Sequence, residues 1–426
     1  MKVLIMGSPT TKGYYAFGIK KQVVGGGWVE NLVEFLKQKG IDLYVCFYSE
    51  LFHDNEEKKY QGVEYIGLPI RVKGLTRCNE QMIDDLRVTL DNISPDVVHI
   101  IGTEREHDYQ LLKLAGAEKT VVSITGLVSV YSKHYYGGIP QKSFKIRSLG
   151  DMYRHGGPIK EQHNFYRWGQ KYEIPMIKAA KYVMGRTTWD YACVKQINPD
   201  IKYFYCGEVL NDIYYNNIWD IKQVKQHSIF MSQGSYPLKG LHQLLEAFPL
   251  VLKLYPDAQI NIAGPDILCN DGIIKKLKRT TYSYYLEKKL KELAIPRERV
   301  NFIGPLNASD MAKQYLSCNV FVLPSAIENS PNSLGEAMIM GVPCIASCVG
   351  GIQDMIKDRI NGYVYPFDEP YMLAYYICNI FADTDQAVCI GTAARKSALD
   401  RFNREKIVNS TLQIYHHILE TKSTHV

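Results

Sequence analysis

Two glutamates, Glu328 and Glu336, stand eight positions apart in the segment SAIENSPNSLGEAM, residues 325–338. A helix that begins between them would offer unpaired backbone N–H groups and the positive end of its dipole to an anion. These amides are expected at Asn332, Ser333 and Leu334. Because carboxylates repel an anion, the two glutamates are expected to face neutral hydroxyl groups beside it. A sugar attached to a nucleotide diphosphate offers both the anion and the hydroxyls.

The elements around these glutamates follow from local sequence signals. The preceding run NVFVLP is short, apolar and rich in β-branched and aromatic residues, which predicts a buried strand. Ser330 is suited to cap a helix, Pro331 to its first position and Gly341 to its end. The segment therefore predicts a strand, a loop and a short helix.

A lysine is expected at the same edge of the same sheet. Lys239 ends the loop SQGSYPLKG, which follows a predicted strand and leads into a predicted helix, and Gly234 lies in the same loop. A diphosphate would bind at such a place, and an ammonium there would offset the charge that grows on a departing phosphate. The alternative is a solvated surface lysine. A later loop, CVGGIQDMI, contains Gly350 and Gly351, which permit close backbone approach.

The first half of the chain contains further candidates. Gly25, Gly26 and Gly27 precede a predicted helix and would let backbone amides meet a phosphate, with an ordinary turn as the alternative. His107 follows the predicted strand DVVHII and would donate to a substrate hydroxyl or carry a proton, or else serve packing. Arg186 follows another strand and would reach an anion, or else form a surface ion pair.

Two series of alternating strand and helix signals predict two doubly wound α/β domains that face a central cleft. We expect an N-terminal Rossmann-like domain over residues 1–210 and a C-terminal nucleotide-sugar-binding domain over residues 211–402. A C-terminal helix, residues 403–426, is expected to return to the first domain. The 426 residues suffice for two such cores.

Charge and hydropathy narrow the class of partner and the compartment. A net charge of +6 is mild for this length and does not indicate nucleic acid. No signal peptide and no membrane-spanning run is visible. The ten cysteines are scattered without a Cys-x-x-Cys pair, which predicts reduced thiols in a cytoplasmic protein. Residues 133–172 interleave basic and aromatic side chains over a segment read as a long irregular insertion. Such a surface would suit an anionic lipid headgroup or an acceptor glycan, and thus peripheral membrane contact; the alternative is a structured lid.

Four segments taken in order, GSYPLKG, IENSPNSLGEAMIMGVPCIAS, VGGIQDMI and NGYVYP, resemble the donor half of family 4 glycosyltransferases of the GT-B fold. The resemblance implies a retaining transfer from a nucleotide-diphosphate sugar to an acceptor hydroxyl of a glycan or lipid-linked acceptor, in polysaccharide or glycolipid biosynthesis, without an essential metal or other cofactor. It assigns the ribose hydroxyls to Glu336, the hydroxyls of the transferred sugar to Glu328 and the diphosphate to Lys239. His107 matches a family histidine beside the donor sugar only approximately. The donor base is expected at the loop of Ile303 and Gly304.

Two departures from the family pattern concern phosphate and sugar contacts. The arginine usual before the lysine is absent, since Gln233, Gly234 and Ser235 stand there, and Arg186 is a candidate substitute. The usual glycine-phenylalanine-glycine after Glu328 is replaced by SPN. A sugar-nucleotide epimerase or phosphorylase of the same architecture and a non-catalytic nucleotide-sugar-binding subunit remain alternatives. The absence of G-x-G-x-x-G disfavours a dehydrogenase.

Overall fold

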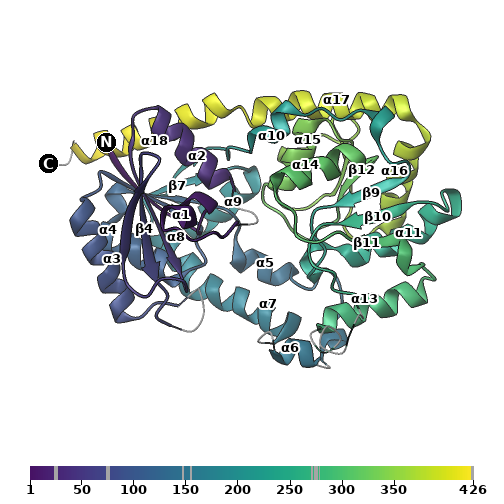
Figure 1. Ribbon diagram of the computed structural model, residues 1–426, viewed down its shortest axis with the longest axis horizontal. Coiled ribbons are helices and arrows are strands. Elements are labelled where there is room, and N and C mark those ends of the chain that lie inside the picture. The colour runs from purple at the N-terminus through teal and green to yellow at the C-terminus, as the bar shows by residue number, and fades with distance from the viewer. Residues whose placement is uncertain are drawn as a thin grey trace. The chain divides into compact units, whose positions relative to one another are not determined.

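The chain folds into two compact α/β units, each built on its own sheet, as a computed structural model shows (Figure 1). The first unit comprises residues 1–130, 166–211 and 402–426, and the second comprises residues 131–165 and 212–401. The structure describes residues 1–23, 27–72, 77–145, 148–153, 156–269, 272, 277 and 279–423.

The sheet of the first unit has the strand order β3-β4-β2-β1-β5-β6-β7-β8. Its strands are β1 (Lys2–Met6), β2 (Asp42–Ser49), β3 (Glu56–Tyr60), β4 (Val63–Pro69), β5 (Val97–Ile101), β6 (Thr120–Ser123), β7 (Tyr182–Gly185) and β8 (Lys202–Tyr205). All pairs are parallel except β3 with β4. The charged sequence EEKKY of β3 lies exposed at one edge of the sheet, where charge opposes pairing with another chain.

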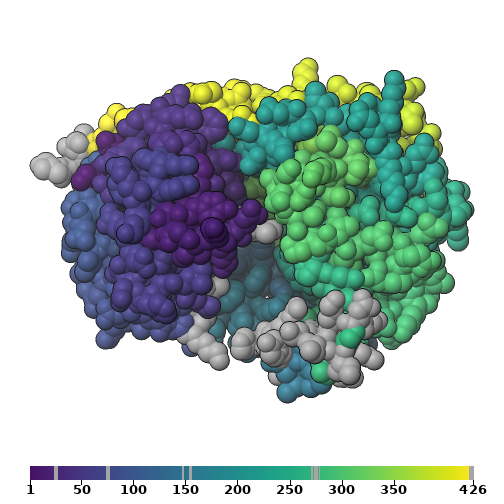
Figure 2. Space-filling view, in the orientation of Figure 1, coloured from purple at the N-terminus to yellow at the C-terminus, as the bar shows by residue number. Residues whose placement is uncertain are grey.

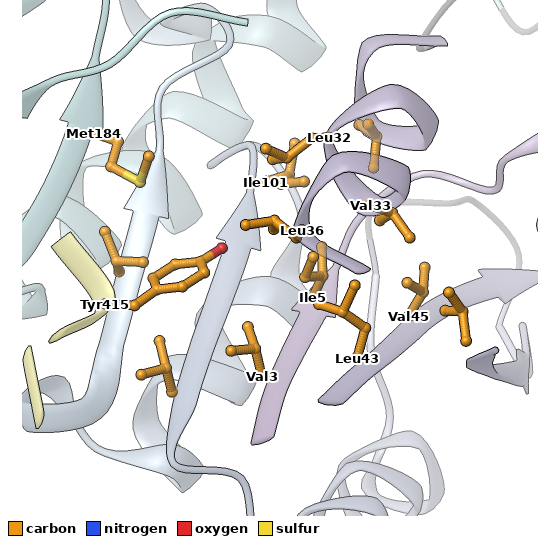
Figure 3. Close-up of a cluster of buried hydrophobic side chains, with 14 of the residues drawn as sticks. Val3, Ile5, Leu32, Val33, Leu36, Leu43, Val45, Ile101, Met184 and Tyr415 are labelled. Carbon is orange, nitrogen blue, oxygen red and sulfur yellow. The ribbon is translucent and has the colours of Figure 1, made fainter. Parts of the chain in front are cut away.

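Helices cover both faces of this sheet. They include α1 (Thr11–Ala16), α2 (Gly27–Gln38), α3 (Glu80–Ile93), α4 (Glu106–Ala115), α8 (Ile174–Ala179), α9 (Thr188–Ile197) and α18 (Arg404–Ser423). Figure 3 shows side chains of α2 meeting those of β1 and β2, namely Leu32, Val33, Leu36, Ile5, Leu43 and Val45. A second apolar cluster, formed with α3, α4, α8 and α9, fills the opposite face.

The sheet of the second unit is wholly parallel in the described residues, with the order β11-β10-β9-β12-β13-β14. Its strands are β9 (Ser228–Met231), β10 (Gln259–Ile262), β11 (Val300–Phe302), β12 (Val320–Leu323), β13 (Cys344–Ser347) and β14 (Tyr363–Tyr365). Its helices include α10 (Asp212–Asn216), α11 (Leu241–Leu254), α13 (Thr281–Glu292), α14 (Ala308–Ser317), α15 (Asn332–Met340), α16 (Pro370–Ala382) and α17 (Thr384–Arg401). The order is that of a doubly wound sheet, whose ligands bind beyond the carboxyl ends of the strands.

The C-terminal helix α18 belongs to the first unit, as the sequence predicts. Asn403 caps it, because the side-chain Oδ1 accepts a hydrogen bond from the Lys406 amide at 3.0 Å. The Tyr415 hydroxyl lies 2.7 Å from Nδ1 of the buried His99, and this contact joins the helix to β5. Figure 2 shows the outer side of the helix, in yellow, at the surface.

The structure of segment 131–165 differs from two predictions. It groups with the second unit, although the sequence analysis placed it in the domain of residues 1–210. It is also largely helical rather than irregular, with α5 (Val128–His134), α6 (Leu149–Tyr153) and α7 (Gly157–Trp168). Two buried side chains hold it on the second unit: Nε2 of His242 lies 2.6 Å from the carbonyl oxygen of Gly137, and Asp151 accepts a hydrogen bond from the Thr281 amide at 3.0 Å.

Candidate functional site

Lys239 and Glu328 form a close ion pair in the second unit. The Nζ atom of Lys239 lies 2.6 Å from Oε1 of Glu328, whose side chain is only 7% exposed. Lys239 ends a short turn, η5 (Pro237–Lys239), that follows β9, and Glu328 lies in the loop that follows β12. Since β9 and β12 are parallel neighbours, both side chains lie at the carboxyl edge of this sheet.

Neighbouring side chains stabilise the charged form of Lys239. Burial favours the neutral amine, but Glu328 and then Tyr236 outweigh it and raise the pKa of Lys239 above its ordinary value. The ammonium is therefore charged at neutral pH. It has three donors; Glu328 accepts from one and Tyr236 from another, which leaves one donor for an oxygen of a phosphate.

Backbone contacts fix the two loops against each other. The Ala326 amide donates to the carbonyl oxygen of Leu238 at 2.8 Å. The next turn, at Gly350, approaches even closer: a Cβ added at Gly350 would stand 1.9 Å from the carbonyl oxygen of Glu328, and its φ of +52° favours glycine. The Gly351 amide donates to that same oxygen at 3.0 Å. The position of Glu328 thus depends on main-chain packing from two sides.

Helix α15 begins beside this pair, and its first residues are the predicted Asn332, Ser333 and Leu334. It begins one residue later than predicted. Pro331, which has an extended backbone, is the N-cap residue, and Ser330 therefore does not cap the helix. The Ser330 hydroxyl instead lies 3.5 Å from Nη2 of Arg401. Gly341 ends the helix in the left-handed conformation, as predicted.

Glu336 points to a pair of tyrosines. The Tyr315 hydroxyl lies 3.0 Å from Oε2 of Glu336 and 3.0 Å from the carbonyl oxygen of Ser333. Burial raises the pKa of Glu336 to about 7, although hydrogen bonds from Tyr315 and Tyr214 act in the opposite direction. Both tyrosines are buried. Glu336 therefore changes its protonation state near neutral pH.

This shift gives a testable pH dependence of stability. The pKa of Glu336 is higher in the folded chain than the ordinary value of 4.5, so the folded state holds the proton more strongly. The stabilisation is present in full below pH 4.5 and is lost as the pH rises toward about 7. Glu336→Gln removes this titration. We therefore expect the Tm of wild type to decrease relative to the Tm of Glu336→Gln as the pH rises from 5 to 8. A difference that stays constant over this range would contradict the shift.

Two other predicted donor-site residues lie at the same sheet edge. Gly234 follows β9 and is buried against the first turn of α11. Ile303 follows β11, and its amide donates to the carbonyl oxygen of Ile262 at 2.9 Å. The structure thus brings the candidates of the second half of the chain to the carboxyl ends of β9, β11 and β12.

The candidates of the first half belong to the first unit. His107 is buried on α4, its ring centre 4.5 Å from that of Tyr48, and burial followed by the Arg105 charge lowers its pKa. This environment agrees with the packing alternative. Arg186 forms an ion pair with Glu208 at 2.6 Å, but the pair is buried and not at the surface. Gly27 opens α2 at an exposed position, and Gly25 and Gly26 lie outside the described residues.

The tyrosines that surround the charged side chains were not predicted from the sequence. Tyr236 precedes the Lys239 turn, and its ring stacks on that of Tyr135 with centres 6.4 Å apart. Tyr315 lies on α14 and Tyr214 on α10, both distant from Glu336 along the chain. The only signal was the count of 31 tyrosines, which gives no positions.

A protein-family model matches part of the second unit. Residues 217–397 match the family model described as Glycosyl transferases group 1. Over these residues the chain is similar to group 1 glycosyltransferases. The match covers the sheet edge with Lys239, Glu328 and Glu336, and it confirms the resemblance inferred from the motifs.

Curated relatives match over part of their length. The chain is 29% identical over 188 residues to an uncharacterised glycosyltransferase of Methanocaldococcus jannaschii, which is 44% of each chain. It is 27% identical over 178 residues to a D-inositol 3-phosphate glycosyltransferase of Corynebacterium urealyticum, which is 42% of this chain and 40% of the relative. The chain thus spans less than half of the length of these two relatives.

Solved structures show the fold over nearly the whole chain. Sucrose-phosphate synthase from Thermosynechococcus elongatus superposes with a TM-score of 0.72 at 17% identity, over 99% of this chain and 100% of that chain. HepE of Anabaena, solved in complex with UDP-glucose, gives a TM-score of 0.64 at 15% identity, over 100% of both chains. The expected GT-B fold with two Rossmann-like domains is confirmed.

The described residues contain neither a membrane-spanning helix nor a cluster of metal-ligating side chains. No helix in this part of the chain has the length and apolar character required to span a bilayer. No group of three or more His, Cys, Asp or Glu side chains converges there on a point where a metal ion would bind.

Proposed function

We propose that the protein transfers a sugar from a nucleotide-diphosphate sugar to an acceptor hydroxyl, with retention at the anomeric carbon and without an essential metal, as a family 4 enzyme. The observation that carries this proposal is the Lys239–Glu328 pair, which lies at the carboxyl edge of a doubly wound sheet beside the start of α15. An ammonium and helix amides suit a diphosphate, and the carboxylates suit the hydroxyls of the sugar and the ribose.

The proposed reaction breaks the bond between the anomeric carbon and the diphosphate oxygen. Lys239 and the dipole of α15 offset the negative charge that develops on the leaving diphosphate, and this interaction is strongest in the transition state. The acceptor hydroxyl attacks from the face that the leaving group vacates, and the leaving phosphate takes its proton. Glu328 holds a hydroxyl of the transferred sugar, and Glu336 holds the ribose. His107 has no step in this scheme, because its side chain is buried.

A screen for the donor tests the proposal. HepE was solved with UDP-glucose, which makes uridine diphosphate sugars the first donors to test. We expect one class among uridine, guanosine and adenosine diphosphate sugars to raise the Tm of the full chain in a concentration-dependent manner. Product analysis with and without acceptors then identifies the reaction, since an epimerase alters the donor without an acceptor. No stabilisation by any of the three classes would contradict the proposed donor.

We further propose that the acceptor is glycan or lipid-linked and that residues 133–172 contact the membrane surface peripherally on its cytoplasmic side. In support, Leu149 and Met152 of α6 are 60% and 66% exposed, and Lys142 and Lys145 are exposed shortly before them. Apolar side chains flanked by cations suit the surface of an anionic bilayer. Co-sedimentation of the Leu149→Ser, Met152→Ser variant with anionic vesicles tests this contact, and undiminished sedimentation would contradict it.

A further inference from the structure

A pocket of about 560 Å³ in the first unit has a lining dominated by cations. The lining includes three cationic side chains, Arg77, Arg167 and Lys171, and one carboxylate, Glu106. The volume is in the range of pockets that bind small polar ligands. The formal charge of these four side chains is three minus one, or +2. No residue assigned above to donor binding lines this pocket.

The pocket lies where ligands of doubly wound sheets bind. Arg77 and Cys78 follow β4, and Glu106 follows β5, and these strands run in the same direction within one sheet. Their carboxyl ends therefore lie at the same edge. The third wall is the end of α7 and the short helix η3 (Gly169–Glu173), which packs against α4.

Hydrogen bonds hold these walls together. Oε2 of Glu106 accepts from the Cys78 amide at 3.0 Å and from the Tyr172 hydroxyl at 3.2 Å, so one carboxylate joins the loop after β4 to η3. At the end of η3 the buried Glu173 accepts from the Val128 and Ser129 amides at 2.7 and 3.0 Å. The pocket is thus a built feature of the first unit and not a chance gap between loops.

The cations of the pocket outnumber its carboxylates by three to one. Within the described part of the chain, none of the three forms an ion pair with a carboxylate. The Nε atom of Arg167 is buried without a hydrogen-bond acceptor. A buried donor without an acceptor costs free energy, and three neighbouring cations repel one another. Burial and then Glu106 raise the pKa of Tyr172, whereas Arg167 and Arg77 lower it, which places both guanidinium groups within electrostatic range of one hydroxyl.

We propose that this pocket binds an oxyanion, a phosphate or a carboxylate, carried by a small hydroxylated molecule. Arg167 and Arg77 offer planar pairs of donors that match two oxygens of such a group, and Lys171 adds a further charge. A hydroxyl of the ligand donates to Glu106. If the protein has the proposed function, the oxyanion belongs to the acceptor of the sugar. The acceptor is then a negatively charged polyol or its lipid-linked form.

The experiment uses the full chain and three probes: glucose 6-phosphate, glucose, and vesicles of phosphatidylinositol in phosphatidylcholine. Binding is measured by calorimetry for the sugars and by co-sedimentation for the vesicles. The variants are Arg167→Gln with Lys171→Gln, and Lys171→Gln alone, which changes only an exposed side chain and so preserves folding. The control is Lys58→Gln with Lys178→Gln, which removes two exposed charges elsewhere in the same unit.

We expect wild type to bind glucose 6-phosphate at least tenfold more tightly than glucose. The double variant should lose at least tenfold in affinity for glucose 6-phosphate, Lys171→Gln should lose less, and the control should bind as wild type does. Vesicle binding that depends on Arg167 and Lys171 would instead identify the lipid-linked source of the same oxyanion. Equal affinity of wild type and the double variant for glucose 6-phosphate and for the vesicles would overturn the proposal. Equal affinity of wild type for glucose and glucose 6-phosphate would also overturn it. Titration with nucleotide sugars in the same samples tests the proposed function separately, because that site lies in the second unit.

Discussion

Replacement of Lys239 by alanine is expected to lower turnover by about a hundredfold or more, on the scale of losing one donor to a developing oxyanion. The reason is that its ammonium is charged and keeps one donor beyond those that Glu328 and Tyr236 occupy. Because the interaction with the leaving diphosphate is strongest in the transition state, the loss should appear in kcat more than in KM for the donor. Steady-state kinetics with the donor found by the screen give both constants.

Two further variants separate catalysis from structure. Lys253→Ala removes an exposed lysine from α11 in the same unit and should keep turnover within about twofold of wild type. Glu328→Gln combined with Lys239→Ala completes a double-mutant cycle, and we expect losses that are far from additive because the two side chains are in direct contact. Wild-type turnover by folded Lys239→Ala would remove the role assigned to this residue.

Gly350→Ala is expected to lower the free energy of unfolding by about 3 kcal/mol or more, as the sum of a strained backbone and an overpacked contact. The added Cβ would stand 1.9 Å from the carbonyl oxygen of Glu328, and φ is +52°. Any relaxation must move the loop of Glu328, so turnover by the remaining folded protein should fall at least tenfold. Urea denaturation and kinetics measure the two effects.

A matched substitution isolates the contact from the backbone strain. Gly40 has a φ of +75° but nothing within 4 Å of an added Cβ. Gly40→Ala should therefore show only the conformational cost of about 1 kcal/mol. If Gly350→Ala were no more destabilising than Gly40→Ala, the close approach of Gly350 to Glu328 would not be a constraint on the site.

The candidate site in the second unit was largely predictable because its signals are local. The run NVFVLP forms β12 over Val320–Leu323, and Gly341 ends α15. Once strands and helices alternate, the strands of the sheet run parallel, so that every loop that follows a strand lies at one edge of the sheet. The proximity of Lys239 and Glu328 followed from this topology, although 89 residues separate them.

Features that depend on long-range contacts escaped prediction. β3 has the charged sequence EEKKY, and β14 has only three residues, so neither gives a clear apolar signal. A histidine that follows a strand looks the same whether its ring faces solvent or, as His107 does, packs in the interior. The attachment of segment 131–165 to the second unit depends on Asp151 and His242, and nothing near either residue in the sequence indicates its partner.

The division of the chain has a practical consequence for dissecting it. The polypeptide passes between the units at 130/131, 165/166, 211/212 and 401/402, so neither unit is encoded by one continuous stretch. A fragment that comprises only residues 212–401 would lack segment 131–165, which contacts Tyr236, His242 and Thr281. Such a fragment would expose aromatic and hydrogen-bonding groups that are enclosed in the intact molecule. A soluble donor half should instead require a gene fusion that supplies residues 131–165 through a designed linker.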